Sequence, residues 1–429
     1  MLTFYPAVGL ATAITTWSMM SGMAASSIKP VAQRLEHLDI LRGFALFGIL
    51  LVNFEWFTRP LQAIVLGADP DLAGLGLTVD WLIVMLAEGK FYPLFSMLFG
   101  VGFALMAERA QARGASFGGL YLRRLLILLV FGAAHLLLIW AGDILLVYAI
   151  SGGLMLLLFA STPVQRLWKW ALTFIVAPLV LMWAAALSIW ATQGDPALHA
   201  TLVAEFEADG AALEQTVARA AEIHATGSWM DNVVQRLDDG RFLLENAAFW
   251  IPPILGYFLL GRWLIATQRL LQPDRHRLFF RRWRSRGLLL GLPLAAGGAW
   301  LMHDATAIIP TPGVAVGMTL TTVGALLLSL AYLSMVVLGR EQLRFLAPAG
   351  QMALTNYLCQ SLVWTWLFYG HGLGLWQDIG RAWHPLLVLG FFALQVVFSR
   401  VWLARFRFGP VEWLWRSLTY GKRQPFRCT

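Results

Sequence analysis

The stretch HLDILRGFALFGILLVNFEW, residues 37–56, decides the class of fold, because no charged residue lies between Arg42 and Glu55. A helix needs about 20 predominantly apolar residues to cross the hydrocarbon core of a bilayer. The whole chain has the same character, since 59% of its 429 residues are hydrophobic and only 13% are charged. A soluble domain carries roughly 25% charged residues. The sequence therefore predicts an integral membrane protein of the all-α class.

Further apolar stretches predict a polytopic bundle of about ten transmembrane helices. We expect the spans at residues 40–58, 79–107, 121–141, 143–161, 168–192, 246–266, 287–303, 313–338, 351–370 and 384–403. Residues 34–192 then form an N-terminal membrane bundle, 193–245 an extracytoplasmic helical loop, 246–404 a C-terminal membrane bundle and 405–429 a basic tail. Residues 1–33 are an apolar extension with three open interpretations: an extra span, a degenerate signal, or a segment upstream of the working start.

The distribution of basic residues predicts the orientation of the chain. Lys and Arg cluster in every second loop, most densely in residues 269–286, while the alternate loops carry Asp and Glu. Cytoplasmic loops are enriched in Lys and Arg, so we expect both ends of the core in the cytoplasm. The net charge of +8 is therefore a topology signal, and we expect no nucleic acid partner. The two cysteines, Cys359 and Cys428, form no Cys-x-x-Cys pair, so we expect no metal site.

The first span carries polar residues at both ends. Arg42 and Asn53 are eleven residues apart, which is about three turns, so they share one helical face roughly 16 Å apart. Glu55 follows two residues later. A carboxylate at the bilayer border can reach water by snorkelling, so Glu55 alone fits a structural role as well as a functional one.

Two other spans place ionisable residues at membrane depth. The third span has His135 near its middle and Asp143 at its outer turn. The second has Glu88 and Lys90 followed by Pro93, which predicts a broken helix. Ionisable groups within a span are costly unless they face the bundle interior or a wet cavity.

The ninth span adds Asn356, Tyr357 and Gln360, of which Asn356 and Gln360 are one turn apart on one face. Structural alternatives stay open for all these groups: the amides can join helices by hydrogen bonds, Glu88 and Lys90 can pair, and His135 can donate to a backbone carbonyl. One shared polar cavity that opens outward accounts for the four spans more simply. We therefore predict such a cavity.

Five segments together resemble the YeiB family of bacterial inner-membrane proteins. They are LDILRGFALFGILLVN, FYPLFSMLFGVGFAL, RRLLILLVFGAAHLLLIWAGDILLVYA, GQMALTNYLCQSLV and RFRFGPVEWLWRSLTYGKRQP. This resemblance runs from Arg34 to Arg427 and implies a location in the bacterial cytoplasmic (inner) membrane. The first span is also similar to that of the transmembrane acyltransferase superfamily, which includes heparan-α-glucosaminide N-acetyltransferase. In the O-acetyltransferases of that superfamily a histidine follows the arginine by eleven positions, where this chain has Asn53.

The superfamily resemblance implies transfer of an acyl group from a cytoplasmic acyl-CoA donor to an extracytoplasmic sugar, lipid or amine. Such a reaction needs a base, and histidine is the usual one. No histidine lies between Asn53 and Lys90, so His135 with Asp143 is the candidate base. An ideal helix would separate these two by about 12 Å, so a helix break at Gly142 and Glu55 as the true partner both stay open.

Within this hypothesis the catalytic candidates are His135, Asp143, Glu55 and Asn53. Arg42 and Lys90 are candidate ligands for the CoA phosphates, because cationic side chains bind phosphate. Glu88, Asn356, Gln360 and Tyr357 are candidate substrate-binding residues, of which the two amides can also donate to a developing oxyanion.

Two further function classes stay open. A transporter would pass a small solute or lipid through the same cavity, since carriers also use broken helices. A catalytically inactive scaffold is the other alternative. The expected partners are membrane lipids and a small-molecule or glycan acceptor, and a homodimer is among the possible oligomeric states.

Overall fold

The structure is a computed structural model that describes residues 35–69, 71–114, 116–303 and 308–428. It confirms the all-α class, because the described ranges contain no strand beyond one isolated bridge between Phe406 and Arg427. The α-helices are α2 (Glu36–Trp56), α3 (Gly74–Leu86), α4 (Phe91–Ala112), α5 (Phe117–Leu138), α6 (Leu145–Phe159), α7 (Val164–Ala191), α8 (Pro196–Thr226), α9 (Trp229–Glu245), α10 (Ala247–Ala266), α11 (Arg277–His303), α12 (Pro312–Leu338), α13 (Ala347–Gln351), α14 (Ala353–Phe368), α15 (His384–Leu403) and α16 (Pro410–Tyr420). The predicted N-terminal extension, residues 1–33, lies outside the described residues.

Seven of the described segments are long and apolar enough to cross a membrane. They are α2, α3 with α4, α5, α7, α10, α12, and α15 with the 3₁₀ turn η5 (Arg381–Trp383) that precedes it. The shorter apolar helix α6, together with α11 and α14, occupies the remaining predicted positions. The chain is therefore a multi-pass membrane protein.

Helix α2 lies at the centre of the bundle, as its sequence requires. Apolar residues surround most of its circumference, which is typical of a helix enclosed by other helices. Leu41, Leu46 and Leu50 have no exposed surface, and α2 contacts α4, α12, α13, α14 and α15. This position brings the carboxyl-terminal half of α2, with Asn53, into the interior of the protein.

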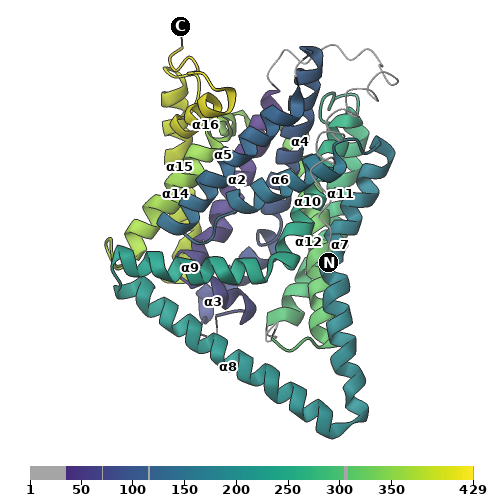
Figure 1. Ribbon diagram of the computed structural model, residues 1–429, viewed down its shortest axis with the longest axis vertical. Coiled ribbons are helices and arrows are strands. Elements are labelled where there is room, and N and C mark those ends of the chain that lie inside the picture. Colours follow the sequence, from purple (N-terminus) through teal and green to yellow (C-terminus); the bar gives the residue numbers. More distant parts are fainter. Residues whose placement is uncertain (1–34, 70, 115, 304–307, 429) are drawn as a thin grey trace, which may run out of the picture.

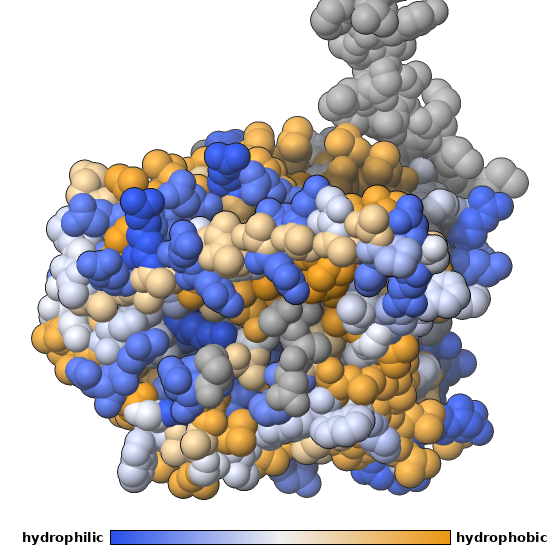
Figure 2. Space-filling view, turned by 90° about the horizontal axis from the view of Figure 1, so that it is seen from below, coloured by the Kyte–Doolittle hydropathy of each residue, from blue (hydrophilic) through white to orange (hydrophobic). Residues whose placement is uncertain are grey.

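Helices α8 and α9 lie at the end of the molecule opposite α16 (Figure 1). They fill residues 193–245, the predicted helical loop. Asp195 accepts hydrogen bonds from the first backbone N–H groups of α8, and Ser228 and Asp231 form a capping box at the start of α9. Such caps stabilise a helix by about 0.5–2 kcal/mol. Figure 2 views this end from below and shows hydrophilic residues spread among hydrophobic ones.

Candidate functional site

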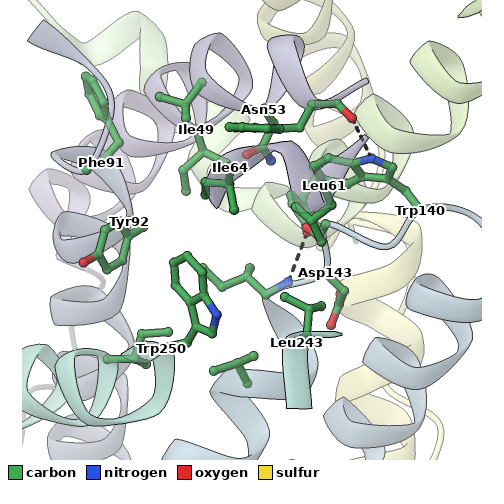
Figure 3. Close-up of a pocket in the computed structure, with 18 of the residues that line it drawn as sticks. Ile49, Asn53, Leu61, Ile64, Phe91, Tyr92, Trp140, Asp143, Leu243 and Trp250 are labelled. Atoms are coloured by element: carbon green, nitrogen blue, oxygen red, sulfur yellow. Dashed lines mark hydrogen bonds between the residues drawn. The ribbon is translucent and has the colours of Figure 1, made fainter. Parts of the chain in front are cut away.

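A cavity of about 210 Å³ lies between α2, the 3₁₀ turn η2 (Leu61–Val65), the α3–α4 break, the α5–α6 loop and the region where α9 meets α10. Figure 3 shows Ile49 and Ile64 on its upper side and Leu243 and Trp250 on its lower side. Most of its wall is aliphatic or aromatic. The cavity therefore differs from the predicted polar chamber, because several of the predicted polar side chains are bound elsewhere.

His135 and Asp143 form a direct, buried pair. His135 Nδ1 lies 2.8 Å from Asp143 Oδ1, and the two side chains are 1% and 0% exposed. The contact exists because α5 ends at Leu138 and residues 139–144 turn back toward α5. The other carboxylate oxygen of Asp143 accepts a hydrogen bond from the backbone N–H of Leu146, 2.7 Å away, at the start of α6. Of the two alternatives, the structure has the helix break.

Gly132 makes room for this pair. It lies one turn before His135 on α5 and is buried. A Cβ atom at position 132 would lie 2.9 Å from Asp143 Oδ2 and would also meet the backbone N–H of Leu146. Only glycine therefore lets the start of α6 approach α5 closely enough for the carboxylate to reach His135.

The second ring nitrogen of His135 has no hydrogen-bond partner. Nε2 is buried and unpaired within the described part of the chain. A carboxylate only accepts hydrogen bonds, so beside an ionised Asp143 the proton lies on Nδ1 and Nε2 carries the lone pair. His135 is not part of the cavity wall itself, but Asp143 and Tyr357 are. The Tyr357 ring centre lies 5.2 Å from that of His135, so the imidazole lies directly behind the wall.

Tyr357 also holds the loop that carries Asp143. Its hydroxyl donates to the carbonyl of Gly142 at 3.2 Å and accepts from the backbone N–H of Ile144 at 3.4 Å. The indole of Trp140 donates to the carbonyl of Trp56 at 3.3 Å, which ties the same loop to the end of α2 (Figure 3). The α5–α6 loop is therefore fixed from two sides.

Helix α9 binds the carboxyl end of α5, a contact that the sequence did not indicate. The indole of Trp229 donates to the carbonyl of Leu138 at 3.1 Å, and the guanidinium of Arg236 donates to that of Leu137 at 3.4 Å. The last carbonyls of a helix lack intrahelical partners, and a cation favours that end. Arg236 is 1% exposed. Trp229 and Arg236 thus satisfy the end of α5 where the chain leaves the helix.

A second buried polar cluster accompanies Arg236 in the α8–α9 region. Gln62 and Gln235 both donate to Asp239 Oδ1, at 2.5 and 2.9 Å, and burial raises the pKa of Asp239 to about 6. His224 Nδ1 lies 2.8 Å from Asn232 Oδ1, and burial lowers the pKa of His224 to about 4. None of these residues lines the cavity.

Glu55 is bound by arginines and does not contact His135. Arg381 Nη2 lies 2.8 Å from Glu55 and 2.7 Å from Asp80, and Arg59 lies 3.3 Å from Glu55. This cluster joins the end of α2 to α3 and to the turn before α15. The alternative that Glu55 is the partner of His135 is therefore wrong. Asn53, two residues before Glu55 on α2, lines the cavity.

The predicted break of the second span is present, but it precedes Pro93. Gly89 between α3 and α4 has φ +75°, a left-handed conformation that favours glycine. Lys90 Nζ donates to the carbonyl of Val84 at 2.7 Å, and the Tyr332 hydroxyl donates to that of Leu86 at 2.8 Å. Lys90 is 1% exposed, and its ammonium hydrogen-bonds a backbone carbonyl that the break leaves without a helical partner.

Glu88 belongs to the same break, and its neighbours Ala87 and Gly89 line the cavity while Glu88 does not. Arg42, at the other end of α2, forms an ion pair with Asp39 at 2.7 Å and is 31% exposed. The structure therefore does not bring Arg42 or Glu88 to the cavity.

Asn356 and Gln360 point at α15 instead of the cavity. Asn356 Nδ2 donates to Ser399 Oγ at 3.0 Å, and Gln360 Nε2 donates to Gln395 Oε1 at 2.8 Å. Gln395 in turn donates to the backbone carbonyl of Asn356 at 2.9 Å. The two amides do share a face, as predicted, but that face joins α14 to α15. Tyr357, rotated by about 100° from Asn356, is the residue of α14 that reaches the cavity.

Comparison with known proteins identifies the family. A family model described as a protein of unknown function (DUF418) matches residues 265–422. The uncharacterized protein YxaH of Bacillus subtilis (strain 168) is 34% identical over 93% of this chain and 98% of its own length. The uncharacterized protein YeiB of Escherichia coli (strain K12) is 30% identical over 90% of this chain and 96% of its own length. The chain belongs to the YeiB (DUF418) family.

A third YeiB-family relative, the uncharacterized 39.9 kDa protein in the amylase 3′ region of Bacillus acidopullulyticus, is 30% identical over 92% of this chain and 97% of its own length. No solved structure matches the chain significantly. The family model covers Tyr357 but begins after His135 and Asp143. The candidate site of this YeiB-family protein thus combines residues inside and outside the region that the family model matches.

Proposed function

We propose that this protein is a membrane acyltransferase in which His135, oriented by Asp143, is the general base. The observation that carries the proposal is the buried contact of 2.8 Å between His135 Nδ1 and Asp143 Oδ1. Behind the cavity wall, His135 Nε2 has no hydrogen-bond partner in the part of the chain that the structure describes. A carboxylate–imidazole pair with one free nitrogen is the arrangement that activates a hydroxyl or amine for acyl transfer.

The proposed reaction moves one acyl group and one proton. The acceptor oxygen or nitrogen attacks the thioester carbonyl of the donor, and His135 Nε2 takes the acceptor proton. The new C–O or C–N bond remains while the C–S bond breaks. His135 then gives its proton to the leaving CoA thiolate, which departs as the thiol. Asp143 holds the imidazole and stabilises its protonated form. Asn53 lines the cavity, and in this proposal its amide donates to the developing oxyanion.

His135 must reach the cavity for this chemistry. Tyr357 is the side chain next to it, and its hydroxyl is bound to Gly142 and Ile144 of the α5–α6 loop. A rotation of Tyr357 would open the wall at Nε2, and the proposal requires that movement. Catalytic hydrogen bonds often form only in the substrate complex.

The donor and the orientation are also part of the proposal. We propose acyl-CoA as the donor and the bacterial cytoplasmic membrane as the location, with the α16 end in the cytoplasm because Lys and Arg concentrate in the loops at that end. Arg42, on the opposite half of α2 from Asn53, is proposed to meet a CoA phosphate by exchanging its Asp39 partner.

The test is acyl transfer by the purified protein in nanodiscs, with an amino sugar, a small amine and the nanodisc lipid supplied as acceptors. Transfer is followed as release of free CoA from acetyl-CoA and octanoyl-CoA. His135→Gln should abolish CoA release, while His276→Gln, which changes a histidine in the α10–α11 loop, should release CoA at the wild-type rate. Both variants should still fold, as judged by a single elution peak and a cooperative melting transition. Wild-type CoA release by His135→Gln would contradict the proposal.

A carrier is the second candidate, and the α3–α4 break favours it, because Ala87 and Gly89 of the break line the cavity. Discontinuous helices border the binding sites of many secondary transporters. Proteoliposomes distinguish the two functions: uptake or exchange of a solute without acyl-CoA, together with no CoA release in any preparation, would favour the carrier.

A further inference from the structure

We infer that the cavity binds the hydrocarbon part of an acyl chain, so that the substrate class of the proposed enzyme is a chain longer than acetyl. This inference rests on the proposed function for the reaction, but its evidence is the wall of the cavity. The occupant is expected to lie between α2 and α10, with its reacting end at Asp143 and Tyr357.

The wall supports a hydrocarbon occupant because it offers few polar partners. Ile49, Ile64, Phe249, Trp250 and Ile254 are among the side chains that enclose the space. A sugar in such a site would leave its hydroxyl groups without hydrogen bonds, which costs free energy. An apolar chain removes apolar surface from water at no such cost.

The polar groups of the wall give the chain a direction. Asp143 and Tyr357 lie together at the α5–α6 loop, and His135 lies behind them. Asn53 faces the same space from α2 (Figure 3). A carbonyl carbon near these groups would leave the tail to run toward Trp250 of α10, which lies across the cavity from Asp143 (Figure 3).

The size of the cavity limits how much of a ligand it holds. At about 210 Å³ it is smaller than the roughly 300–1,000 Å³ of sites that enclose a whole drug-sized molecule. The cavity therefore takes one chain of a larger molecule, with the CoA or lipid headgroup outside it. Both a fatty acyl thioester and a phospholipid can supply such a chain.

Photocrosslinking tests the inference without requiring turnover. The protein in nanodiscs is irradiated with an octanoyl-CoA or a phosphatidylcholine that carries a diazirine in its chain, and labelled peptides are located by mass spectrometry. Label from at least one of the two probes should appear in the peptide that contains Leu243 and Trp250. The probe that labels it identifies the source of the chain.

Variants that fill the cavity with a larger side chain can be compared with one that adds the same bulk elsewhere. Ile64→Trp, and Leu243→Trp as a second site, should lower this labelling by at least about tenfold, the scale on which apolar pockets discriminate chains. Ile150→Trp places the same bulk on α6, where Ile150 is 37% exposed, and should label like the wild type. If one filling variant does not fold, the other decides the test.

The outcomes separate this inference from the proposed function. Label elsewhere only, or undiminished label in both folded filling variants, would overturn the inference, even if acetyl-CoA is turned over. Correct labelling that is lost in the filling variants supports it, even if no CoA is released. In that second case the chain site stands and the acyltransferase proposal fails.

Discussion

Two centres of buried polar side chains in this protein differ in how completely their hydrogen bonds are paired. In the α14–α15 centre, Asn356 and Gln360 bind Ser399 and Gln395, and each of these bonds joins the two helices. In the α5–α6 centre, His135 binds Asp143 through Nδ1, and its Nε2 has no partner among the described residues. Most buried polar groups are paired, and His135 Nε2 is one of several buried polar atoms in the described residues that are not. It is the one that belongs to an imidazole fixed by a carboxylate.

The difference separates polar residues that hold helices together from those available for chemistry. Interhelical hydrogen bonds between amides stabilise membrane bundles modestly, and a closed network has no group left for a ligand. An imidazole fixed by a carboxylate, beside a cavity, has one. The predictions below change each centre in turn, from the largest expected effect to the smallest.

Asp143→Asn should lower the rate of CoA release by about 10²–10⁴-fold, the usual contribution of general base catalysis. The amide can donate to Nδ1 and so favours the wrong tautomer of His135. Gln360→Met is the counterpart in the α14–α15 centre and should leave the rate unchanged. Equal rates for both variants would remove the distinction between the centres.

Titration of the α8–α9 cluster should show that Asp239 and His224 make the stability of the protein depend on pH. The pKa of Asp239 is raised to about 6, so the native state binds more protons than the unfolded state between about pH 4 and 6, and stability falls as pH rises there. The pKa of His224 is lowered to about 4, so stability rises with pH between about 4 and 6.5.

The two effects oppose each other, at up to about 3 kcal/mol each, and single variants should expose them. The melting temperature of Asp239→Asn should rise more steeply with pH over this window than that of the wild type. That of His224→Gln should fall with pH relative to the wild type. Parallel melting curves for all three proteins would contradict the assignment.

Gly132→Ala should disturb the α5–α6 centre while both ionisable residues, His135 and Asp143, stay in the sequence. The added Cβ would meet Asp143 and the start of α6, so the carboxylate should move away from His135. A displacement of the carboxylate by up to about 1 Å lowers turnover by about 10- to 100-fold. Gly153→Ala on α6, where a Cβ meets nothing within 4 Å, should keep the wild-type rate, and an equal loss in both variants would refute the steric argument.

Gln395→Leu should affect stability alone. It leaves the Gln360 amide and the Asn356 carbonyl without their partner, which costs about 1 kcal/mol in a membrane bundle. The expected result is a lower melting temperature with normal CoA release. Leu394→Ala, at a position that is 68% exposed, is the control and should melt with the wild type, and a loss of CoA release in Gln395→Leu would place this network in the site.

The class of fold could be predicted from the sequence, because the length of an apolar stretch and the spacing of residues along a helix are local properties of the chain. The spans, the α3–α4 break and the shared face of Asn356 and Gln360 all follow from residue spacing. Which neighbour that face meets depends on how α14 packs, and spacing does not encode it. For the same reason Asn356, Gln360 and Tyr357 were predicted to line one cavity, whereas of these three only Tyr357 lines it.

The site needed contacts between distant segments. Asp143 reaches His135 because of a helix end that Trp229 and Arg236 bind from α9, 91 and 99 residues along the chain from Leu138 and Leu137. Glu55 is held by Arg381, 326 residues away. The sequence indicated the His135–Asp143 pair only through two ionisable residues near Gly142, and it left the partner of His135 open.

A density map of the protein with a non-hydrolysable thioether analogue of octanoyl-CoA tests the central claim most directly. The account predicts the analogue's chain between α2 and α10, Tyr357 displaced, and the carbon that replaces the thioester carbonyl close to His135 Nε2. An analogue bound elsewhere, with His135 still enclosed behind Tyr357 and the cavity empty, would contradict it.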